Sequence, residues 1–217
     1  MDKPHSLSIR GYSGQTVPNE FFPAGEPANH LAIIFPGRGY TALMPVLYYP
    51  TLVLNELGAD ILRVDYQFNS EDFMRLPEKE RDQRFYHEVS AAFQAGIAQG
   101  KYNRLTLVGK SLGTLAIGHL LETATLPEKV DCLWLTPLIG LEHLRKQIAG
   151  KRHRALFVIG TKDPHFNMAH LAEVEKATAG RCAVIEGADH SLEIPGKVSD
   201  SVRAQTRIIE AVERFFV

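Results

Sequence analysis

A serine between two glycines is the feature of this sequence that most plainly suggests chemistry. The pentapeptide GKSLG, residues 109–113, directly follows the apolar run 105–108, and a helix-period segment, 112–124, leaves it. A sharp turn from strand to helix exposes a serine hydroxyl and places it at a helix N-terminus, where free amides favour a developing oxyanion. Flanking glycines allow the backbone to pack closely at such a turn. This context predicts that Ser111 is a nucleophile.

A phosphate-binding loop is the main alternative for the same residues. Its pattern, G-x-x-x-x-G-K-[ST], also lies between a strand and a helix. That pattern requires a glycine at position 104, where the sequence has Arg104, and residues 104–108 are typical of a strand and not of a flexible loop. The sequence therefore favours the nucleophilic serine over a nucleotide site.

A serine hydroxyl needs a base to remove its proton and an anion to orient that base. Candidates for both follow later apolar runs, with Asp163 after residues 155–159 and His190 after residues 183–185. Parallel strands end at one edge of a sheet, so we expect Asp163 and His190 to meet Ser111 at that edge.

Other side chains compete for these two roles. His165 follows Asp163 by two residues and is an alternative base, whereas Asp65 ends an earlier apolar run, where an aspartate more often caps a loop. Asp189 adjoins His190 but is expected to point elsewhere. The remaining histidines of predicted helices are expected to pack or to face solvent, namely His87, His119, His143 and His170.

The chain order Ser111, Asp163, His190, with the serine on its strand-to-helix turn, resembles the α/β-hydrolase superfamily. The match covers residues 31–217 approximately and is to small, lidless serine hydrolases of the esterase type. It implies one α/β-hydrolase domain over residues 1–217 and a carboxylic ester hydrolase that forms an acyl-enzyme on Ser111. Thioesterase or amidase activity uses the same triad. A noncatalytic binding protein that retains the fold is the alternative from another class.

The resemblance also implies an oxyanion hole. One donor is the amide after the nucleophile, here Leu112, and the other comes from the loop after an early strand, here residues 36–40. Within that loop the amide of Arg38 is the first candidate and that of Gly39 the second. The Arg38 guanidinium either recognises an acidic group on the substrate or faces water.

The substrate pocket is expected to be open. Many relatives insert a lid after the strand that corresponds to residues 132–135, whereas residues 136–141 pass at once into a helix here. Lys110 and Lys162, near the mouth, are expected to be solvated. The predicted pocket residues are Gly37, Tyr40, Phe68, Pro137 and Leu138. A further group follows the oxyanion loop and is expected in the core or at an interface, with an acyl pocket as the alternative, namely Met44, Leu47, Tyr48 and Tyr49.

Alternating strand and helix patterns position these residues. They predict a mainly parallel, twisted sheet with helices on both faces and no cap domain. Six apolar runs predict strands at 31–35, 61–65, 105–108, 132–135, 155–159 and 183–185. Helical patterns cover 50–57, 81–98, 112–124, 141–149, 169–179 and 201–216, and four of them end at a glycine. Residues 6–12 and 16–22 predict an edge hairpin, and residues 67–80 lack clear periodicity.

The composition excludes several other classes. The 217 residues carry a formal net charge of −1, so no charge surplus favours nucleic acid. The most apolar stretch, residues 42–54, contains two prolines and is too short to span a bilayer. No apolar run follows the charged N-terminus, so we expect no secretory signal and a cytoplasmic location, with Cys132 and Cys182 reduced. No metal-ligand spacing occurs. We expect no cofactor and no metal, a small-molecule acyl substrate, and a monomer or homodimer.

Overall fold

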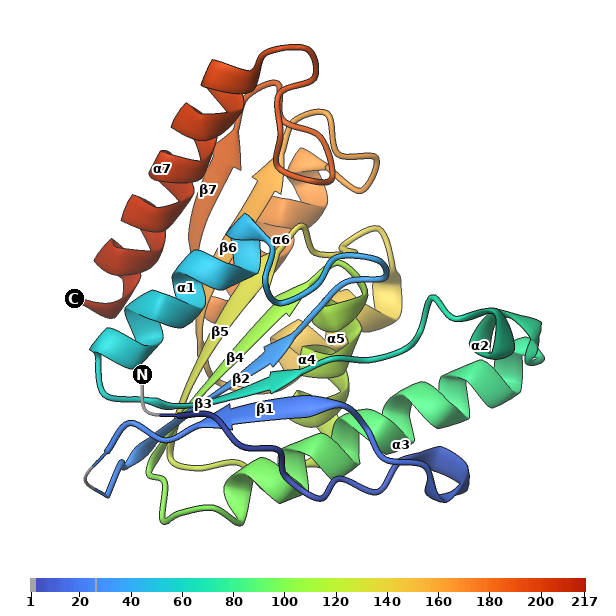
Figure 1. Cartoon of the computed structure of the whole chain (residues 1–217). Helices are drawn as coiled ribbons and strands as arrows, with labels where there is room; N and C mark the ends of the chain where they lie inside the picture. The colour runs from blue at the N-terminus through green and yellow to red at the C-terminus, as the bar shows by residue number, and fades with distance from the viewer. Residues whose placement is uncertain (1–2, 26) are drawn as a thin grey trace.

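The computed structural model describes residues 3–25 and 27–217. Its centre is a seven-stranded sheet in the order β1-β3-β2-β4-β5-β6-β7 (Figure 1). β1 runs antiparallel to β3, and all other neighbours are parallel, so the predicted mainly parallel sheet is confirmed. The strands are β1 (Asn19–Phe22), β2 (His30–Phe35), β3 (Asp60–Val64), β4 (Arg104–Lys110), β5 (Lys129–Leu135), β6 (Arg154–Gly160) and β7 (Arg181–Ile185).

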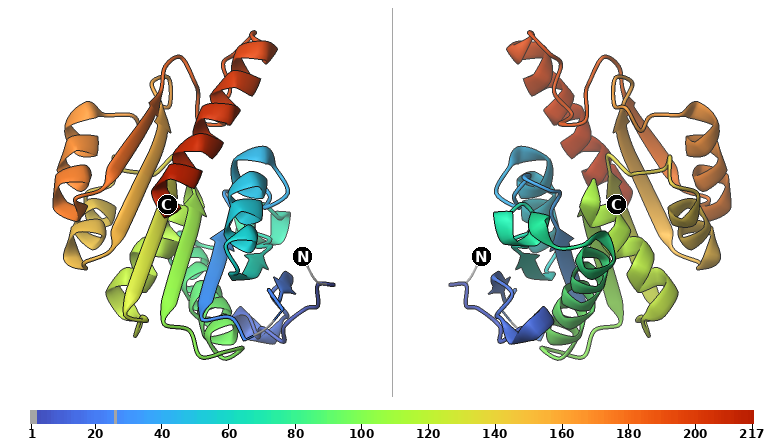
Figure 2. Two further views of the ribbon diagram at one scale, coloured as in Figure 1. Left: turned by 90° about the vertical axis from the view of Figure 1, so that its left-hand side faces the viewer. Right: turned by 90° about the vertical axis from the view of Figure 1, so that its right-hand side faces the viewer.

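Helices cover both faces of the sheet, as predicted. Figure 2 shows α1 and α7 on one face and the longer series from α3 to α6 on the other. The helices are α1 (Pro45–Glu56), α2 (Glu71–Arg75), α3 (Glu78–Ile97), α4 (Leu112–Thr123), α5 (Glu142–Gly150), α6 (Met168–Thr178) and α7 (Val198–Phe216), with a 3-10 turn, η1, at Tyr12–Gly14.

The central strands are largely apolar because both of their faces are buried, whereas the edge strand β7 is mostly accessible to solvent. Along β2, Ile33 contributes to the core under α3 to α6, whereas its neighbours Ala32 and Ile34 contribute to the core under α1 and α7. All three side chains have 0% exposure. Successive side chains of a strand point to opposite faces, so a continuous apolar run is what a sheet covered on both sides requires.

The N-terminal segment forms the predicted hairpin only loosely. The chain turns at η1 and returns antiparallel to itself, but only the isolated bridges His5–Phe21 and Arg10–Thr16 join the two arms, and the one regular strand there is β1. The reason lies in Asn19, whose buried carboxamide takes the place of ladder hydrogen bonds. Its Oδ1 accepts from the amide of Leu7 at 2.8 Å, and its Nδ2 donates to the Leu7 carbonyl at 2.9 Å.

Two helices in the first half depart from the predicted pattern. α1 begins at Pro45, ahead of the predicted start at Pro50, because a proline in the first turn loses no helical hydrogen bond. α2 lies in a segment predicted to lack periodicity. The Ser70 hydroxyl caps it by accepting from the amide of Phe73, and the Phe73 ring is buried.

The connection from β5 to α5 consists of residues 136–141, so the predicted absence of an inserted lid at this point is confirmed. No helix in the described part of the chain has both the length and the apolar character needed to cross a membrane.

Candidate active site

Ser111 lies on a strained turn between β4 and α4. Its φ of 52° and ψ of −114° are outside the regions that a non-glycine residue normally adopts. A β-carbon at Gly113 would lie 2.1 Å from the Phe35 carbonyl oxygen, and one at Gly109 would lie 2.4 Å from the Gly113 carbonyl oxygen. The close packing of β4, α4 and β2 at this turn therefore requires both glycines.

The structure brings the three predicted side chains into one hydrogen-bonded chain. The Ser111 hydroxyl and Nε2 of His190 are 2.8 Å apart, and Nδ1 of His190 lies 2.8 Å from Oδ2 of Asp163. A carboxylate only accepts hydrogen bonds, so Nδ1 carries the proton and Nε2 is left to accept from the serine. The Asp163 side chain is fully buried, whereas that of His190 is 33% exposed. This arrangement is able to draw a proton from Ser111.

Backbone contacts hold the acid and histidine loops together. The amide of Lys162 donates to the Ala188 carbonyl at 2.9 Å, and that of Thr161 donates to the Ile185 carbonyl at 3.0 Å. Gly160 permits this approach, because a β-carbon there would lie 2.1 Å from the Ala188 oxygen. Asp163 and His190 thus reach Ser111 from two loops that behave as one unit.

The competing residues have other positions. The ring of His165 lies beside that of His190, with 5.5 Å between centroids, and its backbone amide donates to Oδ1 of Asp163 at 2.8 Å. Asp65 is exposed at the end of β3. Asp189 caps the histidine loop, where its Oδ1 accepts from the amides of Ser191 and Glu193. His165 and Asp189 therefore shape the two loops.

Lys110 differs from its expected solvated position, because it is only 2% exposed. Its Nζ donates to the His190 carbonyl at 2.9 Å and to Oγ1 of Thr136 at 3.3 Å, and it lies 4.4 Å from the centre of the Tyr40 ring. Burial lowers the pKa of Lys110 to about 8, with the Asp163 carboxylate acting in the opposite direction. The ammonium group thus connects β4, the histidine loop and the loop after β2. Lys162 is exposed, as expected.

The loop at residues 36–40 lies directly against the serine turn. A β-carbon at Gly37 would lie 3.4 Å from Cβ of Ser111 and 3.2 Å from the Lys110 carbonyl oxygen. Within residues 3–25 and 27–217, the amides of Leu112, Arg38 and Gly39 donate to no other atom. These amides are thus free to bind a substrate oxygen. The Arg38 side chain is exposed.

The predicted pocket residues divide into two groups. Gly37 and Tyr40 flank the serine turn, and the amide of Leu138 donates to Oγ1 of Thr114, which in turn donates to the Ser111 carbonyl. Pro137 is buried next to Leu138.

Phe68 is a core residue instead, which corrects the prediction that it lines the pocket. It is 2% exposed, and its ring centroid lies 4.5 Å from that of Tyr66 and 4.8 Å from that of Phe73. The short helix α2 carries Phe73 against it and encloses it, and this helix was absent from the predicted pattern. Leu47 is likewise fully buried, whereas Met44, Tyr48 and Tyr49 are each at least 37% exposed.

No cluster of three or more His, Cys, Asp or Glu side chains suited to a metal ion occurs in the part of the chain that the structure describes.

Comparison with known proteins is informative at the level of structure. No protein-family model matches the sequence, and no curated protein matches it. The solved structure of Est1E from Butyrivibrio proteoclasticus with ferulic acid bound superposes with a TM-score of 0.73, at 14% identity and over 98% of each chain. An esterase from Pyrococcus furiosus gives a TM-score of 0.66 at 12% identity, over 98% of this chain and 92% of the other. A serine hydrolase without a lid from Xanthomonas campestris gives 0.64 at 16% identity, over 99% and 95%.

Proposed function

We propose that this chain, which has the α/β-hydrolase fold, is a serine hydrolase that cleaves a carboxylic ester through an acyl-enzyme on Ser111. The observation that carries the proposal is the continuous hydrogen-bonded chain from Ser111 through His190 to the fully buried carboxylate of Asp163. On a fold that hosts many functions, such a chain on a strained turn is a specific argument for nucleophilic catalysis.

Acylation begins when Ser111 attacks the ester carbon. Nε2 of His190 takes the hydroxyl proton as the Oγ–C bond forms, and the carbonyl electron pair moves onto its oxygen. The amide of Leu112, with that of Arg38 or Gly39, donates to this oxyanion. The buried carboxylate of Asp163 stabilises the imidazolium and keeps Nε2 directed at the reacting atoms.

Deacylation repeats these steps with water. The tetrahedral species expels the alkoxide, which takes the proton from His190 and leaves an acyl group on Ser111. Water then gives a proton to His190 and attacks the acyl carbon, and collapse returns that proton to Ser111 and releases the acid. The His190 side chain is 33% exposed, so water has access to its ring.

We propose an ester as the substrate because an alkoxide leaves more readily than an amine, with His190 as the acid for either leaving group. Two of the similar structures support this choice, since one is an esterase and the other holds ferulic acid. Thioester or amide hydrolysis on the same triad, and a noncatalytic binding protein, are the alternatives. Reaction of Ser111 with an acylating reagent separates a hydrolase from a binding protein, and matched ester, thioester and amide substrates separate the hydrolases.

The test is turnover of a panel of simple esters by the wild type and by Ser111→Ala. The proposal predicts a loss of kcat by several orders of magnitude. Ser199→Ala, a matched change of an exposed serine on α7, is expected to leave turnover unchanged. Equal turnover by Ser111→Ala and the wild type would contradict the proposal.

A further inference from the structure

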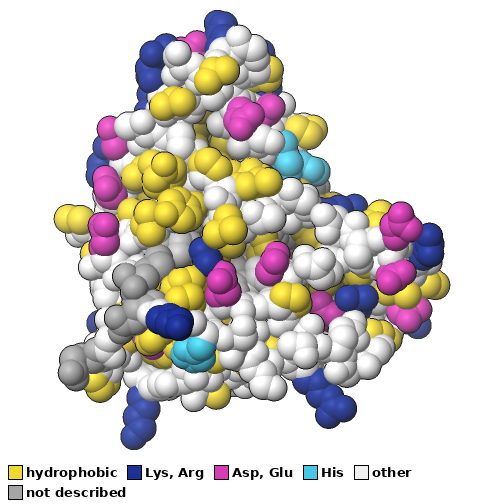
Figure 3. Space-filling model, viewed as in Figure 1, with side chains coloured by type: hydrophobic (Ala, Val, Ile, Leu, Met, Phe, Trp, Pro, Cys, Tyr) yellow, Lys and Arg dark blue, Asp and Glu magenta, His cyan; other side chains and the backbone are white. Residues whose placement is uncertain are grey.

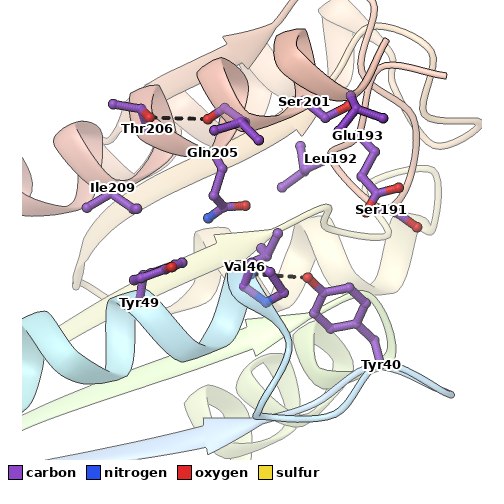
Figure 4. A pocket seen from close by; sticks show the side chains of 13 residues that line it. Tyr40, Val46, Tyr49, Ser191, Leu192, Glu193, Ser201, Gln205, Thr206 and Ile209 are labelled. Carbon is purple, nitrogen blue, oxygen red and sulfur yellow. Dashed lines mark hydrogen bonds between the residues drawn. The ribbon is translucent and has the colours of Figure 1, made fainter. Parts of the chain in front are cut away.

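A cavity of about 410 Å³ lies between α1 and α7, beside the histidine loop (Figure 4). Its volume is within the range of small-molecule sites, which are mostly apolar with a few polar groups. The mechanism proposed above makes no use of it.

The cavity shares two walls with the site at Ser111. Tyr40, which ends the loop after β2, forms one wall, and Ser191 and Leu192, which follow His190, form another. Gly37 is packed between the two sites, because a β-carbon there would lie 3.4 Å from Cβ of Ser111 and 3.5 Å from Cβ of Tyr40. Tyr40 therefore lies between Ser111 and the cavity, and a ligand that occupies both must pass this side chain.

Apolar side chains in the walls of the cavity are exposed to an unusually large extent. Val202 on α7 is 62% exposed, Val198 is 81% exposed, and Tyr49 on α1 is 40% exposed. Figure 3 shows hydrophobic side chains gathered where α1 and α7 face each other. Contiguous exposed apolar surface is typical of binding sites. The cavity thus favours an apolar ligand.

One amide interrupts the apolar lining. Figure 4 shows the Gln205 side chain pointing from α7 toward α1, into the space above Tyr49. Its Nε2 is inaccessible to solvent and has no hydrogen-bond partner among the described residues. A buried donor without an acceptor destabilises the protein. Rotation of the Gln205 side chain into the cavity lets its amide donate to an acceptor on a ligand, which relieves that cost.

The charge of the lining and the direction of proton transfer from His190 restrict the chemical class of the ligand further. Glu193 is the charged residue of the lining, and a carboxylate there disfavours an anionic ligand. His190 must protonate the leaving oxygen, so the alcohol part of an ester lies on the histidine side of Ser111, which is the side of the cavity. Both considerations favour the alcohol part of a neutral ester.

We infer that the cavity between α1 and α7 binds the apolar alcohol part of a neutral ester substrate and that Gln205 meets a hydrogen-bond acceptor on it. This inference rests on the proposed ester hydrolysis at Ser111. It assigns alkyl or aryl esters with at least several carbons in the alcohol as the substrate class.

The test uses acetate esters of graded alcohols, from methyl to hexyl and benzyl acetate. All form the same acetyl-enzyme, so differences in kcat/KM report how the alcohol is bound during acylation. Hexyl acetate is expected to exceed methyl acetate at least about tenfold in the wild type, as discrimination in an apolar pocket permits. Val202→Arg fills the cavity with a charge and is expected to bring that ratio close to one, because kcat/KM for hexyl acetate falls.

The control variant is Val217→Arg, the same substitution at a fully exposed valine outside the cavity, which is expected to keep the wild-type ratio. Gln205→Leu is expected to lower kcat/KM for alcohols that carry an ether oxygen, relative to hexyl acetate. A second series, methyl esters of acids of graded length, measures selectivity for the acid part of the ester. If Val202→Arg changes selectivity for the acid and not for the alcohol, the assignment of the alcohol is wrong.

Binding to Ser111→Ala separates this inference from the proposed function. Hexan-1-ol and benzyl alcohol are expected to shift NMR signals of residues around the cavity in Ser111→Ala, and not in Ser111→Ala combined with Val202→Arg. No shift would overturn the inference even if the ester activity is found. A dimer in light scattering that Val202→Arg dissociates, with unchanged alcohol selectivity, would also overturn it and assign the cavity to an interface between copies.

Discussion

Buried carboxylates lie at both ends of the parallel strands, and Asp163 at the carboxyl ends has a different role from Asp131 at the amino ends. At the edge where the parallel strands end, Asp163 contacts His190, whose other nitrogen meets Ser111. At the opposite edge, Asp131 contacts Arg104 at 2.7 Å and Arg154 at 3.5 Å. A guanidinium keeps its charge, whereas an imidazole gains and loses a proton near neutral pH. The difference teaches that burial of a carboxylate does not identify a site, whereas the partner that it orients does.

Cavity size does not identify the site either. A cavity of about 1030 Å³ lies at the edge of Asp131, and arginines such as Arg152 and Arg181 line it. It is larger than the cavity between α1 and α7. The residues that line it, however, include no serine or cysteine beside a histidine.

Replacement of Asp163 and of Asp131 by asparagine is the most direct test of the difference between the two carboxylates. Asp163→Asn is expected to lower kcat about 10³- to 10⁴-fold, because the amide no longer favours the tautomer with a free Nε2. Ester turnover and thermal unfolding of the purified variant measure the two effects. A variant of normal stability that retains more than a tenth of wild-type kcat would contradict the role of Asp163.

Asp131→Asn is the matched change at the other edge. It is expected to leave kcat within about twofold of the wild type and to lower the free energy of unfolding by about 2 kcal/mol, because charge-assisted hydrogen bonds to Arg104 are weakened. Urea denaturation measures this loss. A large loss of kcat in the folded variant would show that the two edges are not separate in function.

Lys110 and Arg104, the buried or half-buried cations at the two ends of the strands, give a second matched pair of substitutions. Lys110→Met is expected to lower kcat about 10- to 100-fold, because the histidine loop loses its hydrogen bond from Nζ. Stability at neutral pH is expected to stay the same or rise, since burial disfavours the ammonium group. Arg104→Gln is expected to do the opposite, with lower stability and normal kcat. Steady-state kinetics and urea denaturation distinguish the two.

The pH dependence sharpens the part played by Lys110. Its pKa of about 8 in the folded protein is lower than that of an unfolded lysine, 10.5. Between these values the unfolded chain binds more protons, so this group raises the stability of the folded protein as pH increases from 8 to 10.5. Over the same interval kcat/KM is expected to fall, because the positive charge beside the histidine loop is lost.

The measurement is the difference between the wild type and Lys110→Met in both profiles. The variant is expected to lack the fall in kcat/KM and the matching gain in stability. Identical profiles for the two proteins would show that Lys110 does not titrate in this interval.

Much of the carboxyl edge was predictable from local sequence. Each apolar run predicts one strand, although the last of them, β7, is not buried on both faces. The parallel strands carry Ser111, Asp163 and His190 to the same edge. The serine turn follows from two glycines between a strand and a helix. These predictions succeeded because each depends on a short segment and on one rule of topology.

The failures involve contacts between distant segments. The burial of Lys110 depends on Tyr40 and on the histidine loop, which lie far from it in the sequence. Helix ends were also less predictable, because glycine is not the only C-terminal signal. Gly58 has the expected positive φ of 76°, whereas Gly150 is the last residue of α5 and Ala179 takes the left-handed position before Gly180.

The cavity between α1 and α7 could not be predicted from the sequence, because it too depends on contacts between distant segments. Its walls come from helices at opposite ends of the chain, and Val198 and Val202 look in sequence like ordinary apolar positions of an amphipathic helix. Only their exposure shows that α7 has apolar surface beyond what the core uses.

The most direct test of the central claim is the reaction of Ser111 with a fluorophosphonate, followed by mass spectrometry of the intact protein and its peptides. We predict one adduct, on Ser111, whose rate of formation falls at least about 10²-fold in His190→Ala although the serine is still present. No adduct on Ser111 in the folded wild type, or an equal rate in His190→Ala, would contradict the claim that His190 and Asp163 activate this serine.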